Sequence, residues 1–144
     1  MDWQNFLFSF EGRSNRAKYW LFALLGTIFS LVLVAIVFGG GFSMAAWVVA
    51  AVLYLGLLYS AVAVGVKRLH DRDKSGWWLL IFYFGPGILD GVGRLTDASA
   101  ISVAHMVLSV ASLAVAVWGI VELGILRGTR GPNQYGPDPL ERRA

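Results

Sequence analysis

Chemically capable side chains are concentrated in one short stretch, KRLHDRDKSGWW at residues 67–78. Arg68 carries a planar guanidinium that can hold a phosphate or a carboxylate through two hydrogen bonds. An unperturbed histidine side chain titrates near neutral pH, so His70 together with Asp71 could transfer protons or bind a metal ion. Ser75 adds a hydroxyl group. This combination predicts either a binding site on one face of the protein or a local structural unit.

The order of the residues favours the structural interpretation. Arg68 and Lys67 would end a helix, where cations oppose the negative end of the helix dipole. Ser75 would cap the next helix, and Gly76 would permit the turn before it. Recognition of a lipid or a partner is the second interpretation. Catalysis through His70 is the least supported, and the nearby ligands are too few for a metal site.

Known catalytic and cofactor motifs are missing from the sequence. It contains no P-loop, dinucleotide fingerprint, zinc-protease pair or nucleophile elbow. It also contains no cysteine, which excludes disulfides and thiolate metal sites. We therefore expect a protein that is not an enzyme and that has no catalytic residue, no cofactor and no metal.

The composition is that of a membrane protein. Of the 144 residues, 57% are hydrophobic and 15% are charged, against about 45–50% and about 25% in soluble domains. The charges come in blocks, and the apolar stretches between them are about 20 residues long, enough to cross a hydrocarbon core of about 30 Å. The net charge of +3 indicates a membrane surface rather than nucleic acid, because the cations lie beside the apolar stretches.

Four apolar segments predict an all-α membrane protein with four transmembrane helices. The segments are continuous rather than alternating, which favours helices over the strands of a barrel. They cover residues 19–38, 44–66, 77–93 and 101–126. Pro86 and Gly87 interrupt the third segment, so a re-entrant segment that crosses half of the bilayer is its alternative.

The polar flanks predict the orientation of these helices. A lead-in at 1–18 and a Gly/Pro-rich tail at 127–144 flank the membrane domain at 19–126, which contains a charged loop at 67–76. These three polar segments hold all but one of the 12 lysines and arginines, the exception being Arg94. The positive-inside rule then places both termini and the loop in the cytoplasm.

Aromatic residues support this orientation. Trp77 and Trp78 begin the third span, and Tyr19 and Trp20 begin the first. Amphipathic rings are most stable at the boundary between membrane and water, here on the predicted cytoplasmic side.

Three motifs resemble the signatures of the Domain of Unknown Function 805 family, small bacterial inner-membrane proteins. The motifs are FEGRSNRAKYW at 10–20, KRLHDRDKSGWW at 67–78 and GTRGPNQYGPDP at 128–139. They occur in order and span nearly the whole chain. Lys67 is a departure, because a second arginine is usual there. The resemblance implies a multi-pass location in the bacterial inner (plasma) membrane, and it carries no established activity or catalytic residue.

We expect the basic cytoplasmic face to bind anionic lipid headgroups or a protein partner, with each surface cation contributing about 1 kcal/mol to lipid attraction. The candidate residues are Arg13, Arg16, Arg68, His70, Asp71, Ser75, Trp77 and Trp78. Neutralising Arg68, Arg72 and Lys74 is expected to weaken binding to acidic liposomes.

Three ionisable residues fall inside the predicted spans, where such groups are costly and face a partner or water. Glu122 lies about 7 Å inside the cytoplasmic boundary. We expect it to pair with a cation from the lead-in or from the 67–74 loop, with Arg68 and Arg13 as the first candidates. Asp90 and His105 fall toward the outer side and could form a pair at the interface. The same three residues support an alternative function as a small oligomeric transporter or channel.

Small residues spaced four apart predict close helix packing. The pairs are Gly56 with Ser60, Ala61 with Gly65, Gly87 with Gly91, and Ser112 with Ala116. They would serve packing within one chain, a homo-oligomer or contact with another membrane protein, and the sequence does not choose among these.

Overall fold

The structure, a computed structural model, describes residues 2–39, 43–96 and 102–141, and most of these are helical. In chain order the elements are α1 (Trp3–Phe8), α2 (Arg16–Gly39), α3 (Met44–Asp71), α4 (Trp78–Thr96), α5 (Val103–Ile120) and the π-helical turn η1 (Val121–Ile125). The described residues contain no β-strand, only an isolated bridge between Asn133 and Gly136. The predicted all-α class is confirmed.

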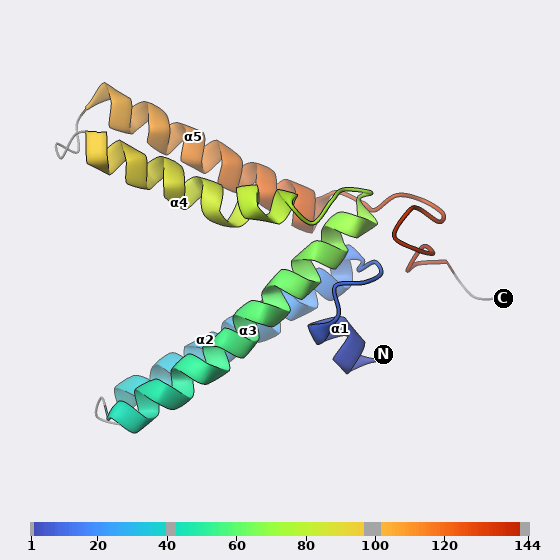
Figure 1. Cartoon of the computed structure of the whole chain (residues 1–144), viewed down its shortest axis with the longest axis horizontal. Coiled ribbons are helices and arrows are strands. Elements are labelled where there is room, and N and C mark those ends of the chain that lie inside the picture. The colour runs from blue at the N-terminus through green and yellow to red at the C-terminus, as the bar shows by residue number, and fades with distance from the viewer. Residues whose placement is uncertain (1, 40–42, 97–101, 142–144) are drawn as a thin grey trace.

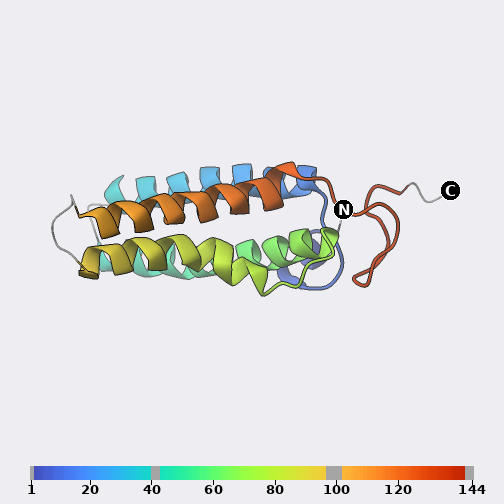
Figure 2. The ribbon, with the colours of Figure 1, turned by 90° about the horizontal axis from the view of Figure 1, so that it is seen from above.

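Two helical hairpins diverge from a common junction (Figure 1). α2 lies along α3, and α4 lies along α5, whereas the two pairs meet only where α2 begins, α3 ends and η1 follows α5. Seen from above, α1, the connection between α3 and α4, and the C-terminal tail all lie at this junction end (Figure 2). The three polar segments of the sequence are therefore brought together in space.

Three helices of the described chain are long and apolar enough to cross a membrane: α2, α3, and α5 extended by η1. In their most apolar windows only 11%, 28% and 17% of the residues are buried inside the protein. Most of their leucine and valine side chains therefore face outward. Such continuous apolar surfaces suit a bilayer rather than water.

α4 continues through its proline. The predicted interruption at Pro86 and Gly87 is wrong, because one helix runs from Trp78 to Thr96 with Pro86 inside it. The Ser112 hydroxyl of α5 donates a 2.9 Å hydrogen bond to the Pro86 carbonyl, so the neighbouring helix adds a polar contact at this point. α4 is not among the three helices that meet the length and hydropathy of a membrane span.

α3 carries the central motif out of the apolar region. Its 28 residues extend over about 42 Å, more than a hydrocarbon core of about 30 Å. The helix passes its expected end at Val66 and stops at Asp71, after which Asp73 adopts a left-handed conformation with φ of 57°. Arg68 and His70 therefore lie on the last turns of a rigid helix rather than in a loop.

The hydrophobic core lies at the junction, where all the long helices meet. Its buried members are Leu69 of α3, Leu79 and Phe82 of α4, and Leu123 of η1. Tyr19, Val66 and Trp78 pack against them. Away from this core most apolar side chains of the two hairpins are exposed, although Leu33 and Val37 of α2 are buried.

The small residues differ in use. A Cβ on Gly65 would lie 2.8 Å from Leu79 Cδ1, so this glycine lets α3 approach α4 closely. A Cβ on Gly56, Gly87 or Gly91 would meet no atom within 4 Å. The Ala61–Gly65 pair thus serves packing within the chain, while these other glycines face open space.

The contact between Ser112 and Pro86 provides a test of the α4–α5 packing. Ser112→Ala should lower the free energy of unfolding by about 0.6 kcal/mol, the average worth of a hydrogen bond between membrane helices. Unfolding in mixed detergent and SDS micelles measures it. Ser30→Ala is the matched control, because the Ser30 hydroxyl bonds the Gly26 carbonyl of its own helix. Equal losses in both variants would contradict the assignment.

Candidate functional site

The Asp71 carboxylate is shared by two buried arginines. Arg68 Nη1 donates to Asp71 Oδ2 over 2.6 Å, while Arg13 Nε and Nη2 lie 3.1 and 3.0 Å from Oδ1. None of the three side chains is more than 4% exposed. Two guanidinium groups carry more N–H donors than one carboxylate can satisfy, and buried donors need acceptors. We call these residues and the main-chain groups they bind the junction network.

Arg68 finds its further acceptors at the end of the last helix. Its Nε donates to the Leu123 carbonyl over 2.7 Å, and its Nη2 donates to the Leu126 carbonyl. The last carbonyls of a helix have no partner within that helix, and a cation there opposes the helix dipole. Arg68 lies in the last turn of its own helix, α3, as expected, and it also binds the closing carbonyls of another helix.

The neighbouring carbonyls are bound in the same way. Gly124 accepts from Trp20 Nε1 over 2.9 Å, Ile125 from Arg16 Nη1 over 3.4 Å, and Arg127 from Arg72 Nη1 over 2.6 Å. Every main-chain carbonyl from residue 123 to residue 127 therefore accepts a side-chain hydrogen bond. The carbonyls at the end of this helix are thus bound by side chains from the start of α2, from the last turn of α3 and from the residue that follows α3.

Arg13 ties the lead-in to the C-terminal tail. Its Nη1 donates to the Gly131 carbonyl over 2.7 Å, and its Nη2 donates to the Thr129 carbonyl over 2.6 Å. The Thr129 amide in turn donates to the Asp71 carbonyl over 2.8 Å. Gly128 makes room for the Asp71 carboxylate, because a Cβ at this position would overlap it. The irregular tail is thus fixed by specific contacts.

His70 is held between the lead-in and the tail. Its ring is parallel to that of Tyr135, with 3.8 Å between the centroids. Its Nδ1 lies 3.3 Å from the Gly12 carbonyl. Asn133 Nδ2 donates to the main-chain carbonyl of His70 over 2.9 Å and to the Thr129 hydroxyl over 3.0 Å. These contacts extend the junction network to both polar ends of the chain.

Glu122 pairs with the connection between α3 and α4. Its Oε1 lies 3.0 Å from both Arg72 Nε and Lys74 Nζ, and its side chain is 4% exposed. The predicted partners, Arg68 and Arg13, are wrong, because both share the other buried carboxylate. The predicted region was right: a cation of the charged loop neutralises Glu122.

Other residues of the motif fix neighbouring segments. Lys67 Nζ donates to the main-chain carbonyls of Asn5 and Phe6 in α1, over 2.5 and 2.7 Å. The Ser75 hydroxyl accepts a 3.2 Å hydrogen bond from the Trp77 amide, which is the geometry of a helix N-cap just ahead of α4. The Trp77 side chain is 78% exposed, so it is available to a membrane interface.

Asp138 closes a turn of the tail. Its Oδ1 accepts the Leu140 amide over 2.9 Å, and its Oδ2 accepts the Gly131 amide over 3.1 Å. The Leu140 hydrogen bond, helped by that from Gly131 and by the charges of Arg13 and Arg127, holds the pKa of Asp138 below its usual value. This carboxylate is therefore ionised at neutral pH.

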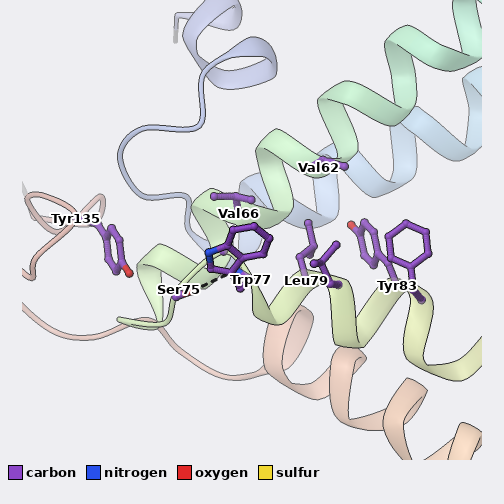
Figure 3. Close-up of a pocket in the computed structure, with 10 residues that line it drawn as sticks. Val62, Val66, Ser75, Trp77, Leu79, Tyr83 and Tyr135 are labelled. Atoms are coloured by element: carbon purple, nitrogen blue, oxygen red, sulfur yellow. Dashed lines mark hydrogen bonds between the residues drawn. The ribbon is translucent and has the colours of Figure 1, made fainter. Parts of the chain in front are cut away.

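An apolar cavity of about 400 Å³ lies in the fork between α3 and α4 (Figure 3). Val62 and Val66 of α3 face Leu79 and Tyr83 of α4 across it, and Tyr135 of the tail lies at its polar end. The Tyr83 hydroxyl reaches the Ala61 carbonyl of α3 at 3.5 Å. The cavity marks where close packing between the two hairpins ends.

The remaining intramembrane residues lie at the end opposite the junction. Asp90 Oδ1 is 3.8 Å from His105 Nε2, and Asp90 Oδ2 is 2.9 Å from Arg94 Nη2. The predicted neighbours thus come together, with Arg94 as a further partner. Glu122 lies at the other end of the α5–η1 segment, so it does not join them. Within the described part of the chain, no group of three or more metal-binding side chains occurs.

The sequence grouped the right residues but missed several partners. Arg13, Arg68, His70 and Asp71 do lie together, in a network that is already filled. Thr129, Asn133 and Trp20 were given no polar role, although the side chain of each forms a hydrogen bond in the junction and lies in one of the three motifs. All three motifs flank membrane helices and contain such hydrogen-bonding side chains, and this pattern could have indicated their polar role.

The comparison with known families agrees with these motifs. A family model described as "Protein of unknown function (DUF805)" matches residues 7–137, which include the junction network from Arg13 to Gly136. The chain belongs to the DUF805 family. This confirms the resemblance inferred from the three motifs.

Curated relatives of this DUF805 chain occur in Escherichia coli strain K12. Uncharacterized protein YiiR is 33% identical over 139 residues, covering 96% of this chain and 90% of the relative. Inner membrane protein YhaH is 30% identical over 146 residues, covering 96% and 97%. Inner membrane protein YhaI is 28% identical over 136 residues, covering 90% and 85%. No solved structure matches the chain. The relatives and the apolar helices together identify a bacterial inner-membrane protein.

The junction network of the DUF805 chain is tested by removing its central charge. Asp71→Asn should lower the free energy of unfolding by about 3–5 kcal/mol, because it leaves two buried guanidinium groups without their counter-charge. Heating in detergent, followed by size-exclusion chromatography, measures the loss. Asp73→Asn is the matched control, since Asp73 is exposed, lies two residues away and forms no ion pair within the described residues. Equal sensitivity of the two variants would show that the network does not stabilise the fold.

Proposed function

We propose that this protein is a non-enzymatic inner-membrane protein with four spans and both termini in the cytoplasm, and that its basic face binds anionic lipid headgroups. The observation that carries the proposal is the sorting of charge along the molecule. Every described lysine and arginine except Arg94 lies at the junction end. That end also holds the exposed ring of Trp77.

The geometry of α4 supports four spans. Its 19 residues extend over about 28 Å, close to the thickness of a hydrocarbon core. It lies along α5, which belongs to a segment able to span the membrane. Four crossings return the chain to its starting side, and the positive-inside rule supports the cytoplasm as that side.

The junction network separates structural cations from surface cations. The structural ones bind main-chain carbonyls or buried carboxylates: Arg13, Lys67, Arg68, Arg72 and Lys74. The surface set consists of Lys18, Arg127, Arg130 and also Arg16, whose single main-chain contact, to the Ile125 carbonyl, is exposed and long at 3.4 Å. We expect the surface set to attract anionic lipid. Replacing Arg68, Arg72 and Lys74 would disturb the fold, so a loss of lipid binding in that variant would not distinguish the two roles.

The contacts of His70 and Asp71 support a non-enzymatic role. His70 stacks on Tyr135 and faces the Gly12 carbonyl, while Asp71 lies between two guanidinium groups. A general base must reach a substrate proton directly or through one water. Here both groups are occupied by structural partners.

The alternative function, a transporter or channel, is less well supported. It needs Asp90, His105 and Glu122 along one path through the membrane. Asp90 and His105 lie at the end of the hairpin opposite Glu122, whose charge is neutralised by the loop. The lipid-binding role fits these positions better.

The proposal is tested with the full chain in neutral detergent, by native mass spectrometry with added phosphatidylglycerol or phosphatidylcholine. The wild type should retain phosphatidylglycerol preferentially. Replacing the surface set together, Arg16, Lys18, Arg127 and Arg130 by Gln, should lower that preference at least about tenfold, since each surface cation contributes about 1 kcal/mol.

Arg94→Gln provides the control, because Arg94 is an exposed cation at the opposite end. It should leave the preference unchanged. A wild type without preference for phosphatidylglycerol would overturn the lipid-binding role, and an equal loss in Arg94→Gln would overturn its location.

A further inference from the structure

A polar cavity of about 250 Å³ lies between the start of α2 and the C-terminal tail. Asn15, just before α2, and Arg16, its first residue, line one part of it, and Arg127, Thr129 and Asp138 line it from the tail. From this arrangement we infer that the cavity binds a phosphate group held between the guanidinium groups of Arg16 and Arg127. The inference rests on the proposed lipid-binding role and gives it a defined chemical target.

The cavity offers donors that the fold leaves available. The Arg127 guanidinium forms no hydrogen bond within the described chain, and Arg16 forms one, a 3.4 Å contact from Nη1 to the Ile125 carbonyl. Planar guanidinium groups bind phosphate oxygens in pairs. Asn15 Oδ1 accepts the Lys18 amide over 2.9 Å, and its Nδ2 remains a donor. These donors line one cavity, from the start of α2 and from the tail.

The charges around the cavity favour an anion although two carboxylates also line it. The charge of Asp71 is offset by Arg13 and Arg68, which both bind it. The oxygens of Asp138 accept two main-chain amides of the tail. Four guanidinium groups thus surround two carboxylates, counting Arg16 and Arg127.

The start of α2 adds to this field. α2 has 24 residues, and the positive end of its dipole lies at Asn15 and Arg16 beside the cavity. A phosphate has several oxygens in a tetrahedral arrangement, so the two arginines can each bind different oxygens of one group. A carboxylate offers only two acceptor oxygens, so it satisfies fewer of these N–H donors than a phosphate does.

The test uses the full chain in neutral detergent with two kinds of probe. Inorganic phosphate and glycerol phosphate, followed by calorimetry, represent soluble ligands. Phosphatidylglycerol against phosphatidylcholine, followed by native mass spectrometry, represents the lipid source. Tighter binding of phosphatidylglycerol than of glycerol phosphate assigns the cavity to a headgroup, and the reverse assigns it to a soluble phosphate ester. Either result supports a phosphate site.

Arg16→Gln and Arg127→Gln should each weaken binding of the retained probe about tenfold, the loss expected for a charge-assisted hydrogen-bond pair. Arg130→Gln is the matched control, because it removes an exposed charge of the same tail outside the cavity. For inorganic phosphate and glycerol phosphate, the effect of Arg130→Gln should stay below about twofold at physiological salt, where exposed charges outside the cavity are screened.

Three results overturn the site: no saturable binding of any probe, unchanged binding in Arg16→Gln and Arg127→Gln, or an equal loss in Arg130→Gln. The failure of the broader proposal looks different. A wild type that binds glycerol phosphate but shows no preference for phosphatidylglycerol would remove the lipid role and keep the site. A preference for phosphatidylglycerol that survives in the Arg16 and Arg127 variants would keep the lipid role and remove the phosphate site.

Discussion

A carboxylate buried between two guanidinium groups holds the three polar segments of this chain together. Asp71 ends a membrane helix, Arg13 comes from the lead-in, and Arg68 lies one turn before Asp71 on the same helix. Ion pairs of this kind are strongly disrupted by the loss of one partner, because the others are left charged and buried. The further N–H groups of both arginines bind main-chain carbonyls, so the fold around them is constrained as well.

This constraint explains how two hairpins can share so little surface and still form one protein. In lipid there is no hydrophobic driving force between helices, so packing and polar contacts must hold them. Here the polar contacts are concentrated where α3 and η1 end. The last main-chain carbonyls of the α5–η1 segment accept hydrogen bonds from side chains at the start of α2 and around the end of α3. The hairpins then diverge from that point (Figure 1).

Much of the architecture could be predicted because it follows from local composition. Uncharged apolar runs predicted the helices, and the block order of the charges predicted that the polar segments would share one end. The role of Pro86 could not be predicted, since whether a helix continues depends on its neighbour, here Ser112. The partner of Glu122 could not be predicted either, because Arg68 and Arg72 differ by one helical turn and only the fold decides which carboxylate each meets. Which cations remain at the surface likewise depends on contacts across the whole chain.

The most direct measurement of the central claim is a double-mutant cycle on Arg13 and Asp71. The free energy of unfolding would be determined for the wild type, Arg13→Gln, Asp71→Asn and the double variant. The two side chains lie 3.0 Å apart and join segments far apart in sequence, so the cycle should give a coupling energy of about 1–3 kcal/mol. Additive effects, within about 0.5 kcal/mol, would mean that the two residues act independently and that the lead-in is not held by Asp71.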